Sequence, residues 1–336
     1  MVVTMKDVAL KAGVSKSAVS RTFTDGASVS EKTRIKVEKA ARELGFQPNV
    51  LASSLTTRRT KLIGLISNNF NNPVFLEVFD LFTLAIQKHG LRPLLVNLSE
   101  EMDPSVSVNT LLQYSVDGVI LASSTLPSNL SEIFTKSGMP VVHSFGRCER
   151  SPKVHTIGVD NRKCGRIVAK TLIERGYQRF GFLGGPSDST STQDRLTGFK
   201  QGLKKQDFHS ALSVRYTEQY SFDEGFRLMS EILQDRSNIA EVYFCGDDVI
   251  SIGAISAIQK AGLSVPEDVG IIGFNDMEMA GWNNISLTTV RQPVREIILS
   301  SIEILTSMVG GDEIKPETKV IPCEIIERET LRPIVA

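Results

Sequence analysis

The sequence is poor in the residues that build metal centres and covalent scaffolds. Its 336 residues include 4 cysteines, 4 histidines and 1 tryptophan. No cysteines form a C-x-x-C pair and no histidines have H-x-x-x-H spacing, which are patterns typical of zinc sites and disulfide frameworks. We therefore expect no metal site and no cofactor. The scattered cysteines predict reduced, mostly buried thiols.

Long apolar runs are also missing. No stretch approaches the roughly 18 apolar residues of a membrane-spanning helix. The first residues, MVVTMKD, reach a charge at once and lack the apolar centre of a secretory signal. Because 41% of the residues are apolar, the composition is still that of a folded chain. These features predict a cytoplasmic protein with no membrane partner, built from about two or three domains.

The chain has no net charge, since 38 lysines and arginines balance 38 aspartates and glutamates. This balance excludes a uniformly basic nucleic-acid binder of the histone kind, but it is not uniform along the chain. Residues 1–60 carry 11 basic and 5 acidic side chains, a net charge of +6; the remaining 276 residues carry 27 and 33, a net charge of −6. A small basic segment joined to a larger acidic body predicts an anionic partner for one end.

The basic segment has the start and stop signals of three short helices. Thr4 begins a capping box, and Gly13 ends the first helix. Ser15 can cap a second helix that runs to about residue 24, and Ser30 a third that ends at Gly45. Two short helices joined by a glycine-containing turn form a helix-turn-helix, whose second helix can enter the DNA major groove.

The second helix has a polar face that can contact DNA. Ser17 and Ser20 are short enough to allow close approach. Arg21 can form paired hydrogen bonds with a guanine edge, and Lys16 can reach a base or a phosphate. The same pattern also suits a helical protein-interaction module with a solvated basic face, and the pattern alone leaves both interpretations open.

From residue 61 short apolar runs alternate with helical stretches, which predicts parallel sheets with helices on both faces. The expected strands are residues 62–66, 92–98, 118–122, 140–144, 179–184, 242–245 and 270–274, and the clearest helices are about 75–89 and 193–206. The run at 179–184 repeats the one at 61–66. We therefore expect two doubly wound lobes, with a ligand at the carboxyl ends of the strands in the cleft between them.

Signatures of enzymes are missing. The glycines at 181–185 do not have the G-x-G-x-x-G spacing of a dinucleotide site, and Pro186 follows directly. Neither G-x-x-x-x-G-K-[ST] nor G-x-S-x-G occurs. We expect no catalytic residues. A sugar-binding protein or sugar-modifying enzyme with an accessory helical domain is the alternative function.

Three segments of the N-terminal region resemble the headpiece of the LacI/GalR (lactose-repressor) family: MKDVALKAGVSKSAVSR at 5–21, VSEKTR at 29–34 and LGFQPN at 44–49. Ala18 stands where the family usually has threonine, so one hydroxyl is missing from this helix. The resemblance continues along the chain and implies two lobes of periplasmic-binding-protein type. It also implies a transcriptional regulator, a repressor, that binds a pseudo-palindromic double-stranded DNA operator as a homodimer.

The predicted organisation is a helix-turn-helix domain at residues 1–48, a hinge at 49–60, and an effector-binding and dimerisation core at 61–336. Lobe 1 would comprise about 61–160 and 292–322, and lobe 2 about 161–291 and 323–336. The resemblance implies that hinge helices of two subunits fold together in the minor groove, with Leu55 as an intercalating wedge. A plain tether with a buried leucine is the alternative. The predicted DNA contacts are Ser15, Lys16, Ser17, Ser20, Arg21, Asn49 and Leu55.

The resemblance further implies a small polar effector, a sugar or sugar acid, between the lobes. Arg195 matches the family's ligand-gripping arginine, which can hold two hydroxyls or a carboxylate. Asp247 and Asn275 match positions that usually read Asn and then Asp. Strand-end polar residues also cap helices and serve turns, which is the alternative role for these side chains. Phe145 stands where several sugar binders have aspartate. The predicted effector-binding residues are Asn68, Phe75, Phe145, Ser191, Arg195, Tyr220, Asp247 and Asn275.

Overall fold

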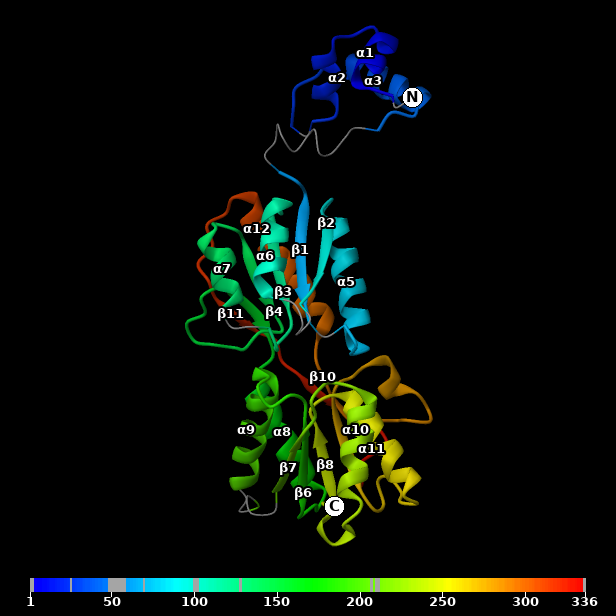
Figure 1. The fold of residues 1–336 in the computed structure, drawn as a ribbon, viewed down its shortest axis with the longest axis vertical. Helices are drawn as coiled ribbons and strands as arrows, with labels where there is room; N and C mark the ends of the chain where they lie inside the picture. Colours follow the sequence, from blue (N-terminus) through cyan, green and yellow to red (C-terminus); the bar gives the residue numbers. More distant parts are fainter. Residues whose placement is uncertain are drawn as a thin grey trace. The chain divides into compact units, whose positions relative to one another are not determined.

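The structure is a computed structural model that describes residues 3–24, 26–47, 59–68, 70–98, 103–126, 129–205, 208 and 212–334. The chain forms two compact units, Met1–Lys61 and Leu62–Ala336, which we call the headpiece and the body (Figure 1). The predicted DNA contacts Asn49 and Leu55 lie outside the described residues.

The headpiece contains three helices, α1 (Met5–Ala12), α2 (Lys16–Thr22) and α3 (Glu31–Leu44). All three begin at the predicted caps, and Thr4 forms a reciprocal capping box with Asp7. Gly13 and Gly45 end α1 and α3 with φ angles of 65° and 66°, which glycine adopts without a side-chain penalty. The second helix is shorter than predicted because the chain turns at Phe23, whose ring centroid lies 5.9 Å from that of Phe46.

A small apolar core holds the three helices together. One face of each helix contributes to it, as the helical spacing of the apolar residues predicts. The buried members are Val8, Ala9, Val19, Val37, Ala40 and Ala41.

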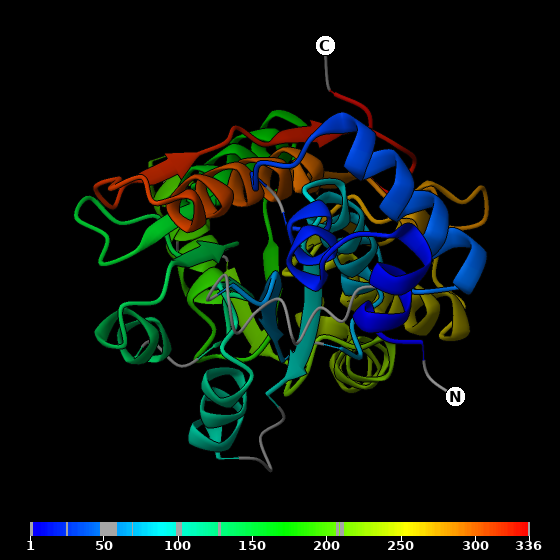
Figure 2. The same ribbon diagram turned by 90° about the horizontal axis from the view of Figure 1, so that it is seen from above.

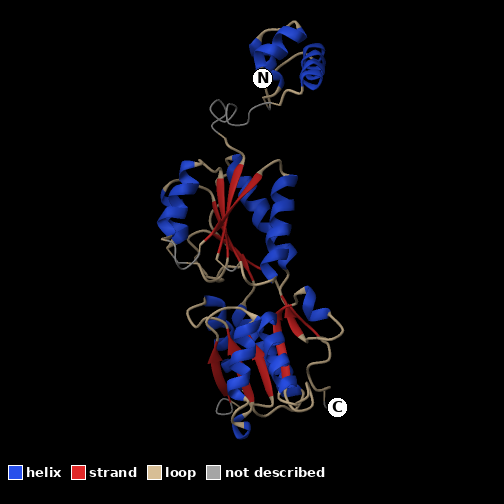
Figure 3. Ribbon diagram, turned by 45° about the vertical axis from the view of Figure 1, so that its right-hand side comes forward, coloured by secondary structure: helices blue, strands red, loops and turns tan. Residues whose placement is uncertain are grey.

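The body contains two six-stranded sheets with helices on both faces (Figure 3). The strand orders are β11-β5-β4-β3-β1-β2 in the first sheet and β12-β10-β9-β8-β6-β7 in the second. All pairs are parallel except β10 with β12. The prediction of two doubly wound lobes is confirmed, and the antiparallel edge strand β12 is an addition to it.

We call the part built on the first sheet lobe 1. Its elements are β1 (Leu62–Ser67), α5 (Val74–Lys88), β2 (Arg92–Asn97), α6 (Pro104–Gln113), β3 (Gly118–Ala122), α7 (Leu130–Lys136), β4 (Val141–Ser144), β5 (His155–Gly158), α12 (Val294–Gly310) and β11 (Thr318–Val320). Helix α12 packs on β3, β4 and β5 of this sheet and against α5, although it is far from them in sequence (Figures 1 and 2).

Lobe 2 is built on the second sheet. Its elements are α8 (Asn161–Glu174), β6 (Phe180–Gly184), α9 (Thr190–Lys204), β7 (Leu212–Tyr216), α10 (Phe222–Ile232), β8 (Val242–Cys245), α11 (Asp248–Lys260), β9 (Gly270–Asn275), β10 (Thr289–Arg291), β12 (Glu324–Ile326) and the 3-10 helices Arg236–Asn238 and Glu278–Gly281. Helix α9 starts three residues before the predicted helix. The chain passes between the lobes at residues 159–160, 292–293 and 321–323.

The strands that the sequence predicts most clearly are those that are buried along their whole length. Every residue of β3, β6, β8 and β9 is buried, because helices cover both faces of a parallel sheet. These strands are the continuous apolar runs of the sequence.

Two of the cysteines form a disulfide, which joins Cys164 in α8 to Cys323 at the third passage between the lobes. The prediction of reduced thiols is therefore wrong for this pair. The two residues are 159 positions apart in sequence, and only the fold brings the first turn of α8 beside the third passage. Cys245 is buried and Cys148 half-buried, and both are free.

Candidate functional site

The second headpiece helix presents a polar surface. Lys16, Ser17, Ser20 and Arg21 are all exposed, whereas Val19 is buried in the headpiece core. Ser15 is also exposed, and its hydroxyl accepts a hydrogen bond from the backbone N–H of residue 18 at 3.2 Å. The predicted DNA-contacting side chains of α2 therefore share one solvent-facing surface of a helix whose other face is fixed by packing.

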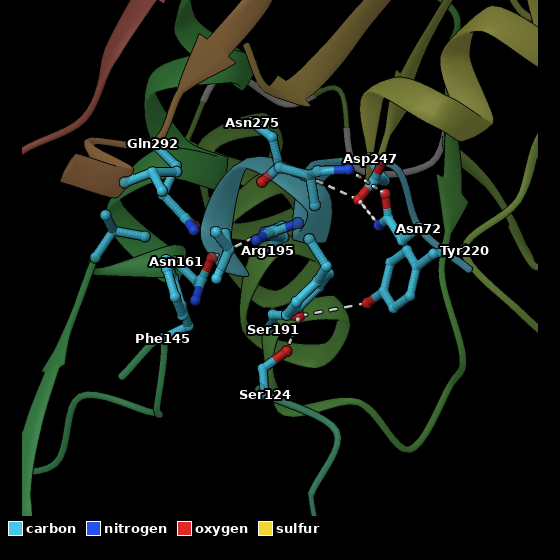
Figure 4. A pocket seen from close by; sticks show the side chains of 15 residues that line it. Asn72, Ser124, Phe145, Asn161, Ser191, Arg195, Tyr220, Asp247, Asn275 and Gln292 are labelled. Atoms are coloured by element: carbon cyan, nitrogen blue, oxygen red, sulfur yellow. Dashed lines mark hydrogen bonds between the residues drawn. The ribbon is translucent and has the colours of Figure 1, made fainter. Parts of the chain in front are cut away.

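In the body, the two lobes enclose a cavity of about 60 Å³ at the carboxyl ends of their strands (Figure 4). Seven of the eight predicted effector-binding residues line it: Phe75, Phe145, Ser191, Arg195, Tyr220, Asp247 and Asn275. The other lining residues are Asn72, Val74, Val78, Ser124, Val159, Asn161, Gln292 and Val294. The cavity is thus rich in amides and hydroxyls, with one cation and one anion.

Asp247 is buried between the lobes and holds three hydrogen-bond donors. Its Oδ2 accepts from the amides of Asn72 and Asn275, both at 2.8 Å (Figure 4). Its Oδ1 accepts from the backbone N–H of Val249 at 2.9 Å. Burial raises the pKa of Asp247 to about 6, and the three donors oppose this rise. Because Asn72 comes from lobe 1, this carboxylate also connects the lobes.

Arg195, in α9, projects into the cavity without an ion-pair partner among the described residues. Its Nε donates to Asn161 Oδ1 at 2.8 Å, and its Nη1 donates to the Gly246 carbonyl at 2.5 Å. The guanidinium lies over the ring of Phe274, 3.4 Å from the centroid. Burial lowers the pKa of Arg195 to about 10, so it remains a cation at neutral pH. A buried cation held by neutral acceptors can still bind ligand oxygens.

Hydroxyl groups gather on one side of the cavity. The Tyr220 hydroxyl lies 3.1 Å from Ser189 Oγ, 3.0 Å from Thr192 Oγ1 and 3.4 Å from Ser191 Oγ. Ser191 Oγ is also 3.0 Å from Ser124 Oγ of lobe 1 (Figure 4). Each hydroxyl can donate and accept, so the cluster can rearrange around a hydroxylated ligand.

Two cavity residues have backbone conformations that non-glycine residues rarely adopt. Phe145 has a φ of 62° and Asn275 a φ of 121°. Such conformations cost on the order of 1–3 kcal/mol and persist where the surrounding structure imposes them. The Phe145 backbone N–H donates to the Ile157 carbonyl at 2.7 Å, which fixes the loop after β4 in this conformation.

Asn68 is the predicted effector contact that does not line the cavity. Its side chain instead bonds to Thr125, accepting from the hydroxyl at 2.8 Å and donating to the carbonyl at 3.3 Å. Sequence reasoning missed Asn72, Ser124, Asn161 and Gln292. The strand-end rule would find Ser124 after β3, but Asn161 and Gln292 follow β5 and β10, which the sequence did not reveal as strands.

A second buried carboxylate lies behind the cavity. Asp248 is fully buried, and its oxygens accept from the Thr289 hydroxyl at 2.5 Å and the Met277 N–H at 2.8 Å. Burial raises its pKa to about 7. These partners tie α11 to β10 and to the segment after β9, so Asp248 supports the wall that carries Asp247 and Asn275.

Comparison with protein families gives two matches. Residues 4–49 match the bacterial regulatory proteins of the lacI family, and residues 169–331 match a periplasmic binding protein-like domain. Among curated proteins, the chain is 29% identical over 330 residues to the HTH-type transcriptional repressor CytR of Escherichia coli (strain K12), covering 98% of this chain and 96% of CytR.

Two solved structures extend this similarity. The lac repressor dimer bound to operator and an anti-inducer has a TM-score of 0.87 at 24% identity, covering 98% of this chain and 99% of that one, which shows a shared fold. The transcriptional regulator CelR in complex with cellobiose has a TM-score of 0.72 at 26% identity, with coverages of 98% and 99%. Among the residues described, no helix has the length and hydropathy to cross a membrane.

Proposed function

Because the chain belongs to the LacI family of bacterial regulatory proteins, we propose that it is a transcriptional repressor controlled by a small polar effector. The observation that carries this proposal is the union of two sites in one chain: an exposed polar helix in a basic headpiece and an amide-lined cavity between two lobes. The domains we propose are the helix-turn-helix at 1–48, the hinge at 49–60 and the core from 61 onward.

DNA recognition would be made by α2. Arg21 and Lys16 supply the cations for base edges and phosphates, and Ser17 and Ser20 allow close approach to the major groove. The hinge would add a minor-groove contact through Leu55, with Asn49 beside it. The +6 charge of residues 1–60 would add sequence-independent attraction to phosphate.

Dimerisation would match two half-sites of a pseudo-palindromic operator. Lobe 1 exposes several large apolar side chains, which supports a protein interface. Leu76 is 78% exposed and Leu84 56% exposed on α5, and Leu95 is 47% exposed on the edge strand β2. A second copy of the chain is the partner we propose for this surface.

The effector would be a sugar or a sugar acid. Amides and hydroxyls suit ring hydroxyls, Arg195 can hold two hydroxyls or a carboxylate, and Phe75 can pack against a ring. Ligand cavities usually measure about 300–1,000 Å³, far more than the 60 Å³ here, so entry requires the lobes to separate. We propose that this movement alters the hinges of the dimer and thereby operator affinity. The protein would act in the cytoplasm, and we propose no catalytic reaction in the cavity.

The direct test is selection of bound fragments from genomic DNA by the purified full chain, followed by footprinting of the enriched sites. We expect a protected, two-fold related site. Arg21→Ala should abolish the footprint at wild-type saturating concentration, whereas Lys39→Ala, an exposed lysine on α3, should preserve it. Absence of any discrete protected site, with or without sugars and sugar acids, would refute the regulator.

The hinge can be tested separately. Leu55→Ala should weaken specific operator binding by roughly 10-fold or more while leaving nonspecific binding nearly unchanged, because a wedge acts only where base steps open. Fluorescence anisotropy with operator and with random duplex measures both. Equal losses on the two duplexes would remove the wedge role.

A further inference from the structure

One ion pair joins the two lobes. Arg147, in the loop between β4 and β5 of lobe 1, donates from Nε to Asp194 Oδ2 at 2.8 Å and from Nη2 to Asp194 Oδ1 at 2.6 Å. Asp194 belongs to α9 of lobe 2, and its side chain is only 9% exposed. The other ion pairs seen between described residues of the body lie within one lobe, except that of Arg166 with Asp160, which stands at the first passage between the lobes. This two-pronged geometry is the strong form of a charge-assisted hydrogen bond.

The ion pair lies outside the cavity. Arg147 and Asp194 line an outer groove together with Cys148 and Arg162, and neither lines the cavity, although the groove shares Val159 and Asn161 with it. By contrast, the interlobe hydrogen bonds of Asn72 with Asp247 and of Ser124 with Ser191 involve cavity-lining side chains. A ligand in the cavity competes with these hydrogen bonds, whereas the ion pair can persist beside a bound ligand.

Helix α9 connects the ion pair to the cavity. Asp194 and Arg195 are successive residues on this helix; Asp194 lines the outer groove and Arg195 lines the cavity. The loop that carries Arg147 also begins at Phe145, which lines the same cavity. The contact between Arg147 and Asp194 therefore restrains both walls of the cavity, since Arg195 directly follows Asp194 and Phe145 lies two residues before Arg147.

Arg162 gives Asp194 a second partner that does not depend on lobe 1. Its Nε donates to Asp194 Oδ1 at 2.8 Å from α8 of lobe 2. The backbones of α8 and α9 touch at Gly198, where an added Cβ would lie 1.9 Å from the Arg162 carbonyl. When the lobes separate, Asp194 keeps its contact with the Arg162 guanidinium. Opening therefore does not leave this carboxylate buried and unpaired, which would be strongly unfavourable.

We propose that Arg147 is a positioning residue for lobe closure: its ion pair with Asp194 holds lobe 1 against the turn of α9 that carries Arg195. Arg162 is the resident partner that makes this contact reversible. That closure of the lobes serves an effector rests on the proposed function, but the role of Arg147 in closure itself does not.

The test is single-molecule energy transfer on the full chain without ligand or DNA. Dyes are attached through unnatural amino acids at the exposed positions Lys136 on α7 and Lys200 on α9, with labelled chains diluted into unlabelled protein. We expect Arg147→Ala to raise the ratio of open to closed molecules about 10-fold. Arg147→Lys should restore part of the closed population, because it keeps the charge but not the fork.

Arg162→Ala is the matched control, since it removes a contact of the same length to the same carboxylate within lobe 2. We expect it to leave the open fraction unchanged or to lower it. Unchanged distances in Arg147→Ala, or equal opening in Arg162→Ala, would overturn the proposal. If circular dichroism shows that Arg147→Ala does not fold, the open fractions of Arg147→Gln and Arg147→Lys are compared instead. Equal open fractions in these two variants and wild type would overturn the proposal. A failed DNA footprint would refute the regulator without affecting this measurement.

Discussion

The two lobes share one strand order but contribute different chemistry to the cavity. Both charged lining residues, Arg195 and Asp247, come from lobe 2, which also supplies Ser191 and Tyr220. Lobe 1 supplies mainly aromatic and aliphatic side chains, such as Phe75. A repeated architecture therefore fixes where a ligand can bind, at the strand ends, but not what each half does there. In this chain, lobe 2 holds the polar recognition groups and lobe 1 covers them.

The lobes also differ in how they respond to pH, and this gives the largest expected effect. Asp248 of lobe 2 has a pKa raised to about 7, so its contribution to stability is full below about pH 4 and is lost as pH rises toward 7. Asparagine does not titrate, so only the wild type should lose this stability. The unfolding free energy of Asp248→Asn minus that of wild type should therefore rise by on the order of 3 kcal/mol between pH 4 and pH 8. Urea unfolding followed by the single tryptophan, Trp282 in lobe 2, measures it.

Lobe 1 should show the opposite trend. Burial lowers the pKa of His143, opposed by its hydrogen bond to the Ser123 carbonyl, so this lobe loses stability as pH falls below about 6.5. Hydrogen exchange of β4 at pH 5 and pH 7 reports on this lobe. A difference between Asp248→Asn and wild type that does not change with pH would break the contrast between the lobes.

The second prediction concerns the polar groups of lobe 2. Arg195→Ala should weaken effector binding by about 100-fold, because a ligand then loses a charge-assisted partner inside a buried site. Calorimetry against sugars and sugar acids measures the loss, once one of them binds the wild-type protein. Arg166→Ala, an exposed arginine of α8, is the control. Equal affinity in Arg195→Ala and wild type would remove Arg195 from the site.

The smallest effect should come from the cover supplied by lobe 1. Phe75→Ala should weaken the same ligand by roughly 10-fold through lost apolar contact. Phe79→Ala is a matched control, since its ring centroid lies 5.8 Å from that of Phe75 but it does not line the cavity. A similar loss in both variants would mean that Phe75 acts through packing within α5 rather than on the ligand.

The sequence predicted those parts of the fold in which burial produces a local apolar pattern. Continuous apolar runs marked β3, β6, β8 and β9, and caps such as Ser30 marked helix starts. The strands β5, β7, β10, β11 and β12 were missed because polar residues interrupt their apolar pattern. Their pairing is decided by tertiary contacts.

The same limit applies to the cavity. Arg195 and Asn275 were found through the family resemblance and the strand-end rule. Asn72 was missed because it lies in a turn, and only the closed lobes bring its amide within 2.8 Å of Asp247, 175 positions away. Asn68, in the same region, was assigned to the cavity but faces Thr125 instead. Local sequence cannot tell which of two nearby asparagines crosses the cleft.

The disulfide between Cys164 and Cys323 closes a covalent ring of backbone that passes through both lobes. The ring starts at α8, includes β6 to β10, continues through α12 and β11 of lobe 1 and returns at the third passage. A single protease cut inside this ring leaves two fragments that migrate as one chain until a reductant is added. A cut before residue 164 releases its fragment at once under denaturing conditions. Non-reducing electrophoresis of nicked protein therefore maps which segments belong to the ring.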